Sequence, residues 1–248
     1  MEKEDYQKLV AVGILTDGSF RIKKCRNTQL IEFYSNDSLL HLTFQECMRK
    51  GFGRDNTSYF HRDKNRYRSN GSLIITGYEL SKKDNIVKVL KELSPTYKTK
   101  ENSNPQPSIR FLLSQKDEVK ELAVRFAMSC DGCVSVAHLK SGKIQASLKF
   151  ACAHPILVYE WKKLFSDVGI NTCLDKDRAN WSNIHGLISS KKRSIMRLQE
   201  IGGFYPRPIK VQNGNYKGLH KNQVLNGICE WFKDKKSNID ALISRNKI

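Results

Sequence analysis

Two apolar segments that end in the same way stand out along the chain. Residues 9–20 (LVAVGILTDGSF) and residues 122–134 (LAVRFAMSCDGCV) each have the pattern of an apolar helix that stops at an Asp-Gly pair. A second similarity follows in the same order, because residues 77–83 (GYELSKK) are similar to residues 186–192 (GLISSKK). Two similarities at nearly equal spacing predict that the fold is duplicated.

The alternation of apolar and polar positions predicts one order of elements in both halves. In the first half we expect strands 20–24 and 29–35, helix 39–50, strands 57–63 and 66–77 around an Asp-Lys-Asn turn, and helix 82–93. In the second half we expect strands 133–140 and 143–152, helix 154–165, strands 171–177 and 183–190, and helix 192–201. With an apolar motif helix in front of each set, the pattern is αββαββα twice. We therefore predict an α+β fold of two pseudo-symmetric half-domains.

The same pattern sets the expected domain boundaries. The first half-domain takes residues 1–100, a polar, proline-bearing linker takes 101–110, and the second half-domain takes 111–210. Residues 211–248 form a C-terminal tail, for which we expect helices around 221–233 and 238–244 and assign no role.

The charge of the chain points to a polyanionic partner. The 248 residues include 43 Lys and Arg against 25 Asp and Glu, for a net charge of +18 and a pI near 9.6. Such a field attracts nucleic acid, and phosphate contacts release counterions. The alternatives are a basic protein without such a partner and an anionic lipid surface, although no basic helix has the amphipathic pattern that a membrane surface requires.

The N-terminus and the cysteines favour an intracellular protein that is not secreted. No apolar run approaches the length of a bilayer span, and MEKEDYQKLV does not have the pattern of a signal peptide. Seven scattered cysteines are typical of free thiols in a reducing compartment, which fits the cytoplasm, nucleoid or an organelle matrix. The pair Cys130 and Cys133 lacks a second pair, so it does not indicate a zinc site.

Small residues in the two apolar helices suggest how the halves meet. Ala11 and Gly13 in one helix, and Ala123, Ala127 and Ser129 in the other, would let the helix backbones approach closely.

If the helices pack through these residues, the carboxylates of Asp17 and Asp131 come together at their C-terminal ends. Gly18 and Gly132 follow them at the sharp turn into a strand. Two adjacent carboxylates repel unless a cation lies between them, and hard oxygen ligands select Mg²⁺ or Mn²⁺. We assign these four residues to a metal site, with a simple turn at each Asp-Gly as the alternative.

The motifs resemble those of a known family. Residues 10–18 (VAVGILTDG), followed by Ser19 and Phe20, are similar to the LAGLIDADG motif, and residues 124–132 (VRFAMSCDG) resemble a degenerate second copy. The order of strands and helices behind each motif, over residues 5 to 210, resembles the single-chain, two-motif form of the LAGLIDADG homing endonucleases.

The resemblance implies a fold and an activity. The motif helices would form the interface between half-domains, and their last acidic residues would bind the catalytic metals. The concave face of each antiparallel sheet would straddle the major groove of double-stranded DNA. Cleavage at the centre of a long, weakly palindromic site would leave short 3′ overhangs, and the enzyme would act as a monomer.

The family also implies a lysine after the last helix of each half. Lys100 is our first choice and Lys98 the second in the first half, and Lys210 is the choice in the second half. Such a lysine could orient the attacking water or offset phosphate charge. The alternative is a solvated surface lysine.

Two departures from the family pattern keep a weaker activity open. Arg125 and Phe126 stand where small residues are preferred, and no Gln occurs late in the second strand of either half. The protein could therefore cut slowly, nick one strand preferentially, or bind without cutting.

The DNA-facing side chains follow from the two-residue period of a strand. Arg21 and Lys23 share one face, opposite Phe20 and Ile22. Arg can bind guanine and Asn adenine, whereas Lys often meets only phosphate. The full set of candidates is Arg21, Lys23, Tyr59, His61, Arg66, Arg68, His138, Lys140, Lys149, Lys176, Arg178, Asn183 and His185. For each of them a solvated charge is the alternative.

These observations favour site-specific, Mg²⁺-dependent cleavage of double-stranded DNA. The second hypothesis is a binding protein of the same fold, either an RNA maturase that binds host intron RNA or a regulator whose nuclease site is lost. The third is a nonspecific basic protein of the chromatin type, against which the repeated motif speaks.

Overall fold

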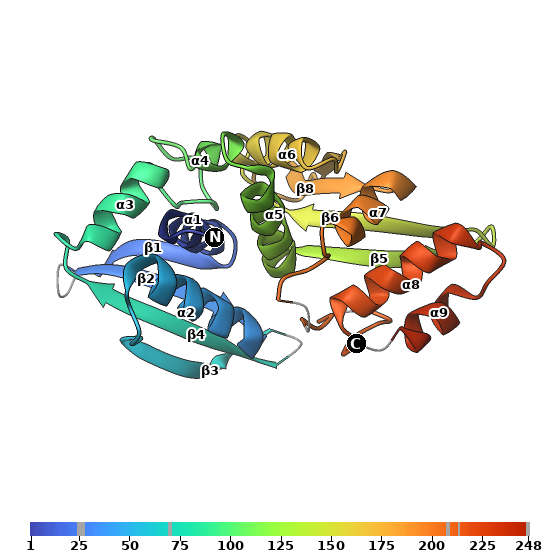
Figure 1. Cartoon of the computed structure of the whole chain (residues 1–248), viewed down its shortest axis with the longest axis horizontal. Coiled ribbons are helices and arrows are strands. Elements are labelled where there is room, and N and C mark those ends of the chain that lie inside the picture. The colour runs from blue at the N-terminus through green and yellow to red at the C-terminus, as the bar shows by residue number, and fades with distance from the viewer. Residues whose placement is uncertain (24–27, 69–70, 207–208, 213, 247–248) are drawn as a thin grey trace.

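The computed structural model describes residues 1–23, 28–68, 71–206, 209–212 and 214–246, with the side chains of 61–72 left out of the description. The first half contains α1 (Lys3–Leu15), β1 (Gly18–Lys23), β2 (Thr28–Ser35), α2 (Ser38–Phe52), β3 (Tyr59–Arg68), β4 (Gly71–Leu80) and α3 (Asn85–Leu93) (Figure 1). The second contains α5 (Asp117–Asp131), β5 (Gly132–His138), β6 (Ile144–Ala151), α6 (Leu157–Asp167), β7 (Cys173–Lys176), β8 (Ile184–Ser189) and α7 (Lys192–Glu200). The predicted double αββαββα order is confirmed.

Three further helices of the described residues lie outside this repeat. A short helix, α4 (Arg110–Leu113), begins at the end of the predicted linker, and α8 (Lys221–Lys233) and α9 (Ile239–Arg245) form in the C-terminal tail. The linker contacts α6, because the carboxylate of Glu160 accepts hydrogen bonds from Ser108, from the backbone of Ile109 and from Arg110.

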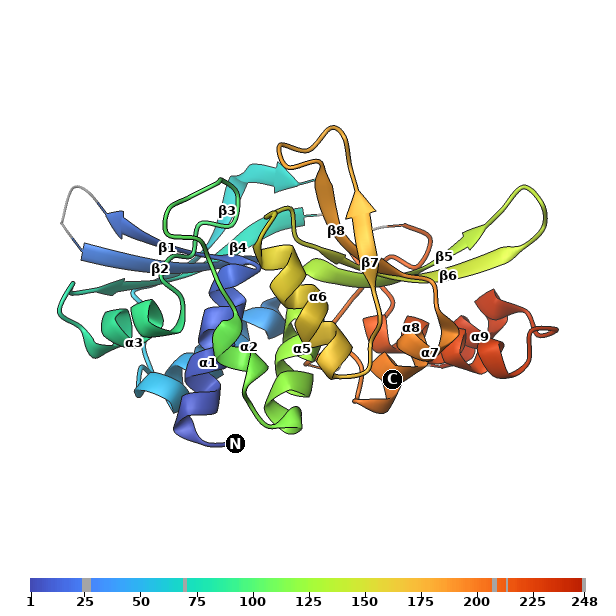
Figure 2. The ribbon, with the colours of Figure 1, turned by 90° about the horizontal axis from the view of Figure 1, so that it is seen from above.

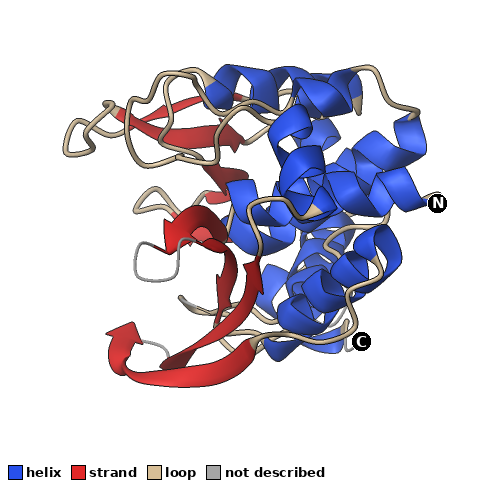
Figure 3. Cartoon of the chain, turned by 90° about the vertical axis from the view of Figure 1, so that its left-hand side faces the viewer, coloured by secondary structure: helices blue, strands red, loops and turns tan. Residues whose placement is uncertain are grey.

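Both halves contain a four-stranded antiparallel sheet of the same topology. The strand orders are β1-β2-β4-β3 and β5-β6-β8-β7. Figures 2 and 3 show the helices gathered on one side of the two sheets, while the other side of each curved sheet carries no helix. The uncovered side is called the open face below. The two open faces lie next to each other and form one continuous side of the molecule.

One predicted turn is wrong. The tripeptide Asp63-Lys64-Asn65 has the composition of a hairpin turn, but β3 runs through it to Arg68. The pairing of β3 with β4 shifts register between Asp63 and Tyr67 instead. The turn-forming residues therefore lie at an irregularity inside the strand, where one strand carries extra residues relative to its partner.

Local capping explains where the helices of the first half begin. The Asp37 carboxylate accepts the backbone N–H of Leu39 at 2.9 Å, and Asp84 accepts that of Ile86 at 2.9 Å. An acidic N-cap satisfies an N–H that has no partner within its own helix. Gly53 ends α2 in the left-handed conformation, at φ 68°, which a glycine adopts without strain.

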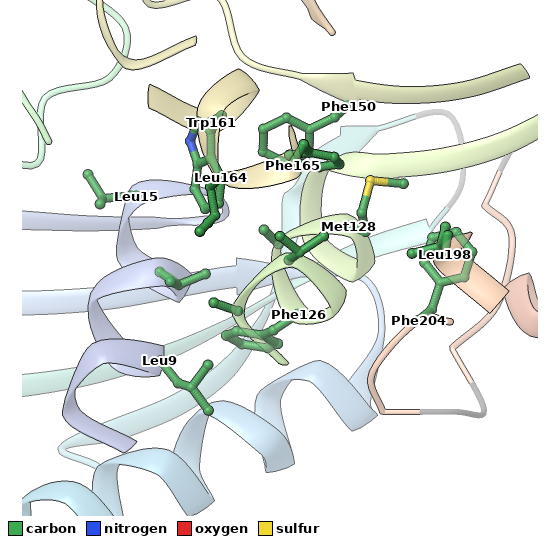
Figure 4. Close-up of a cluster of buried hydrophobic side chains, with 14 of the residues drawn as sticks. Leu9, Leu15, Phe126, Met128, Phe150, Trp161, Leu164, Phe165, Leu198 and Phe204 are labelled. Atoms are coloured by element: carbon green, nitrogen blue, oxygen red, sulfur yellow. The ribbon is translucent and has the colours of Figure 1, made fainter. Parts of the chain in front are cut away.

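The motif helices α1 and α5 pack against each other at the centre of the molecule (Figures 1 and 4). Residues 9–15 of α1 are all buried. A Cβ atom on Gly13 would lie 2.8 Å from the Phe44 ring of α2 and 3.2 Å from the Phe126 ring of α5. Gly13 therefore provides the space that Phe126 fills, which explains why a large residue is tolerated in the second motif.

Arg125, the other departure in the second motif, points away from this interface. Its guanidinium donates to the carbonyl oxygens of Gly202 and Gly203, each at 3.1 Å, and lies over the ring of Tyr205. It thereby attaches α5 to the segment that follows α7. The substitution does not interrupt the contact between α1 and α5.

The tail belongs to the hydrophobic core of the second half. Val224, Leu225 and Ile228 of α8 and Ile243 of α9 are fully buried. Helix α8 lies beside α7 and β5 on the helix side of the second sheet (Figure 2). Removing residues 211–248 would therefore expose a core surface. No helix in the described part of the chain combines the length and apolarity that crossing a bilayer demands.

Candidate active site

The C-terminal ends of the two motif helices meet, and they bring Asp17 and Asp131 to one place. The Thr16 hydroxyl lowers the pKa of the Cys130 thiol, so the residues that precede the two aspartates are neighbours. Burial raises the pKa of the Cys130 thiol, and the charges of Asp17 and Asp131 both add to this effect. The charges of both aspartates therefore reach one thiol where the two motif helices end, and their role as a pair of metal ligands stays a prediction.

Close backbone packing at each turn explains the glycine that follows each aspartate. A Cβ atom on Gly18 would lie 2.6 Å from the Cα atom of Ile14, and one on Gly132 would lie 2.7 Å from the carbonyl oxygen of Met128. Any side chain would collide with the motif helix at these positions. In the first half the backbone N–H of Tyr34 donates to the Asp17 carbonyl at 2.8 Å, which ties this turn to β2.

A third charged group at this place comes from the tail. The Lys221 side chain is 8% exposed, and its Nζ donates to the carbonyl oxygens of Ser129 and Gly132, each at 2.8 Å. Burial lowers the pKa of Lys221, while Cys133, Cys130, Asp17 and Asp131 act in the opposite direction. Because Lys221 is the first residue of α8, far along the chain from either motif, no sequence pattern indicated it.

The groups assembled here have the chemistry that a hard divalent cation prefers. Asp17 and Asp131 offer carboxylate oxygens and Gly18 offers a backbone carbonyl. The Gly132 carbonyl, which we also predicted as a metal ligand, accepts a hydrogen bond from Lys221. Among the described residues there is no group of three or more His, Cys, Asp or Glu side chains suited to a metal. A cation here would complete its shell with water and phosphate oxygens, as Mg²⁺ commonly does.

The predicted lysines are exposed. Lys100 is exposed and follows Tyr97, whose ring packs edge-on against Phe20 of β1. The second choice, Lys98, pairs with Glu101 at 2.7 Å. Lys210 is exposed as well, and its backbone N–H donates to the Asp37 carboxylate at 3.3 Å. Their roles in chemistry stay predictions.

A network of polar side chains lies on the open face of the first sheet. Glu32 is 6% exposed and accepts hydrogen bonds from Tyr34 and Tyr59, each at 2.6 Å, and from Arg21 at 2.8 Å. Burial alone would raise the pKa of Glu32, but the hydrogen bonds from Tyr34, Tyr59 and Arg21 and the positive charge of Arg21 outweigh it, so the pKa is lowered.

Gly77 makes this network possible. Tyr59 pairs with Gly77, which in turn pairs with Glu32, so Gly77 lies between the two side chains in the sheet. A Cβ atom on Gly77 would lie 2.1 Å from the Tyr59 ring. The missing side chain therefore lets Tyr59 reach across β4. The carboxylate of Glu32 and the strand pairings around it were not foreseen from the sequence.

The second predicted cation of β1 is also held by a carboxylate. Lys23 forms an ion pair with Glu79 of β4. Arg21 and Lys23, the basic candidates of β1, are thus each matched by an acidic side chain on the neighbouring strands. The candidates His61, Arg66 and Arg68 lie outside the described side chains.

The open face of the second sheet carries a basic residue where the first sheet carries the acidic Glu32. Ser19 pairs with Glu32 in the first sheet, and the equivalent residue Cys133 pairs with Lys149 in the second. Lys149 therefore occupies the position that Glu32 has in the first half. Lys149 forms no ion pair with any side chain that the structure describes. Both Lys149 and Lys221 lower the pKa of the Cys133 thiol against the effect of burial, which places Lys149 beside the motif turn.

The remaining candidates of the second half are exposed, with one correction. The exposed group comprises Lys140, Lys176, Arg178, Asn183 and His185, in or beside the two hairpins. His138 is exposed too, but its ring lies 3.5 Å from the carboxylate of Asp240 in α9. Alternate residues of a strand point to the same face, so His138 shares the face of Val134 and Val136, whose side chains pack toward the helices. His138 is therefore directed toward the tail and is not available to the open face.

Comparison with known proteins identifies this fold. Neither a family model nor a curated protein sequence matches the chain. Among solved structures, the LAGLIDADG meganuclease I-AabMI bound to uncleaved DNA aligns with a TM-score of 0.55 at 15% identity, covering 97% of both chains. Meganuclease I-SmaMI aligns with a TM-score of 0.53 at 15% identity, covering 96% of this chain and 97% of that one.

A third structure, of mesophilic variants of the homing endonuclease I-DmoI, gives a TM-score of 0.55 at 10% identity and covers 83% of this chain and 96% of that chain. At such identities the likeness concerns the fold. The chain has the two-half fold of the single-chain LAGLIDADG endonucleases, as the motif resemblance implied.

The Glu32 network should make stability depend on pH in the acidic range. Because the folded-state pKa of Glu32 lies below its ordinary value of 4.5, its contribution is complete above that value and is lost as pH falls through the folded pKa. We expect Glu32→Gln to lower the free energy of unfolding at pH 7 by about 1–3 kcal/mol, the cost of breaking a buried hydrogen-bond network. The loss should shrink as the pH falls below 4.5, toward the lowered folded-state pKa of Glu32.

Urea unfolding of both proteins between pH 3 and pH 7 measures this effect. Glu101→Gln is the control, since it removes a carboxylate from an exposed ion pair that contributes little. A Glu32→Gln difference that stays constant across the whole pH range would contradict the role given to the carboxylate.

Proposed function

We propose that the protein is a site-specific endonuclease that cleaves double-stranded DNA by metal-dependent hydrolysis. The observation that carries the proposal is that the packed motif helices end together at Asp17 and Asp131, immediately before the first strand of each sheet. The solved structures of I-AabMI and I-SmaMI, which share this fold, hold DNA. The net charge of +18 supports the same partner.

The residues of the chain take separate parts in this activity. Asp17 and Asp131 would hold Mg²⁺ or Mn²⁺, together with the Gly18 carbonyl. The bound ion would supply Lewis acidity, which neutralises phosphate charge and lowers the pKa of a bound water. Lys100 and Lys210 would lie along the backbone of the bound duplex and offset its charge. Since one chain contains both aspartates, a monomer would suffice to cut both strands and leave short 3′ overhangs.

The two open faces would contact the two halves of the target. Glu32 on the first sheet and Lys149 on the second occupy equivalent positions with opposite charge. The Glu32 carboxylate is already engaged by Arg21, Tyr34 and Tyr59, whereas Lys149 would donate to guanine or to phosphate. The target should therefore be only weakly palindromic, with its two half-sites differing at this position.

A protein that binds nucleic acid without cutting it is the second candidate. It is favoured by one observation, the hydrogen bond from Lys221 that engages the Gly132 carbonyl in the degenerate motif. In that case the partner would be DNA bound as a regulator binds it, or host intron RNA bound by a maturase. Metal-dependent cleavage separates the two candidates.

Asp17→Asn should abolish cleavage. A target duplex recovered by selection from a randomised library in Mg²⁺ provides the substrate. We expect the cleavage rate to fall by more than about 100-fold, since changes in residues that only support metal ligands already cost about 10–100-fold. Binding of the same duplex in Ca²⁺ should be retained.

Asp84→Asn is the matched control, because Asp84 caps α3 and lies outside the site. Cleavage by the Asp17→Asn protein at the wild-type rate would refute the assignment of Asp17. If the wild-type protein bound a selected duplex or intron RNA but cut neither strand in Mg²⁺, the binding-only candidate would replace the endonuclease.

Lys149→Ala should weaken DNA binding in a salt-dependent way. Lys149 has no ion pair among the described residues, so its charge is available to a phosphate. We expect the slope of log K against log[salt] to become shallower by about one unit, the loss of a single phosphate contact. Fluorescence anisotropy with a mixed-sequence duplex between 50 and 200 mM salt, roughly the range in which such slopes are measured, provides the readout.

Lys162→Ala removes the same charge from the exposed surface of α6, on the helix side of the molecule. An equal change in slope for both variants would show that only net charge matters, and the assignment of the open face would be wrong.

A further inference from the structure

The first turn of α8 is a buried polar junction. Lys221, Asn222 and Gln223 are only 8%, 6% and 4% exposed. The Asn222 amide accepts from the backbone N–H of Phe204 at 2.8 Å and donates to its carbonyl at 3.1 Å. Gln223 donates to the carbonyl of Ile243 at 2.9 Å. These contacts fix the start of α8, and with it the position of the Lys221 side chain.

The ammonium group of Lys221 lies at the C-terminal end of α5. Its acceptors, the carbonyl oxygens of Ser129 and Gly132, flank Asp131 in sequence. Carbonyls at a helix end carry partial negative charge and favour a cation. The Phe204 ring lies 5.3 Å from Nζ and covers the group on another side. A buried ammonium requires such partners, and here they are all provided.

Among the residues that the structure describes, the first half has no equivalent of this group. In the described residues no side chain donates to the carbonyl of Gly18, which is the counterpart of Gly132 in strand register. The residue that follows the motif glycine pairs with an acidic residue, Glu32, in the first half and with a basic residue, Lys149, in the second. The two half-sites thus differ by a buried positive charge as well as by the sign of a charge on the open face.

We propose that Lys221 is a positioning residue of the catalytic centre, which holds the turn that carries Asp131 and makes the second half-site a weaker site for a divalent cation than the first. The proposal rests on the proposed function and extends it to a segment outside both motif repeats. The ammonium occupies the carbonyl that the Gly132 position would otherwise offer, and its charge repels a divalent ion nearby. The tail would thereby make the two strand-cutting centres unequal.

Binding of Mn²⁺, followed by electron paramagnetic resonance, tests the proposal directly. The protein is bound to its selected duplex carrying phosphorothioates at the cleaved linkages, with the duplex alone as the blank. Lys221→Gln keeps an N–H donor but removes the charge, and Lys221→Met removes both. Lys221→Arg keeps the charge. Thermal unfolding of each variant shows which of them fold.

We expect wild type to show two classes of Mn²⁺ site, and the neutral variants to bind the weaker class about tenfold more tightly. Tenfold is the size of one charge acting on a dication at a few ångströms in a solvent-like dielectric. Lys221→Arg should keep the wild-type midpoint. Lys192→Gln is the matched control, because Lys192 donates to the Phe232 carbonyl at the other end of α8, at 2.7 Å.

The outcomes separate this proposal from the one on which it rests. If wild type binds Mn²⁺ and a folded neutral variant at position 221 binds it with an unchanged midpoint, the role of Lys221 is refuted and the endonuclease proposal stands. A shift of equal size in Lys192→Gln also refutes it, since any lost lysine–carbonyl bond would then suffice. If wild type binds no Mn²⁺ above the duplex blank, the metal site itself is refuted.

Discussion

The packing of α1 against α5 is the contact on which the other features of this protein depend. It is made possible by Gly13, which leaves room for the rings of Phe44 and Phe126 between the helices. The same contact sets the distance between the two halves, since each motif helix leads directly into the first strand of its sheet. It also brings the helix ends together, with Thr16 beside Cys130, so that the charges of Asp17 and Asp131 reach the same thiol. The placement of the two sheets side by side, with an aspartate just before the first strand of each, thus follows from one interface.

The two halves are similar in fold and unlike in chemistry. Equivalent register positions carry Glu32 and Lys149, and the basic candidates of the first strand are bound by carboxylates, whereas Lys149 is not bound by any described carboxylate. In the described part of the chain, a buried lysine from the tail contacts the second motif turn but not the first. Duplication explains the shared backbone, because the apolar pattern that specifies helices and strands was kept. The charged positions face solvent or a partner, where packing does not constrain them, and they have diverged.

The sequence allowed the element order and the paired aspartates to be predicted, since both follow from local periodicity and from the repeat. It failed where tertiary pairing decides the outcome. Asp63-Lys64-Asn65 has the composition of a turn, yet β3 continues through it with a register shift. Strand parity placed Arg21 on the open face but could not show that Glu32 of the next strand holds it. The alternation of residues along β5 would have excluded His138 from the DNA-contact candidates, because it shares the core-facing side of Val134 and Val136. Lys221 could not be found, because its burial depends on where a distant helix packs.

The central claim is that the motif helices end in contact, and an intramolecular disulfide tests it most directly. Thr16→Cys places a thiol next to Cys130, whose pKa the Thr16 hydroxyl now lowers. Mild oxidation, followed by peptide mapping without reductant, should link the introduced cysteine to Cys130 within one chain, and Cys130→Ser in the same background should prevent this link. If the introduced cysteine stays reduced, or pairs only between molecules, then the helix ends do not meet and the site built from Asp17 and Asp131 does not exist.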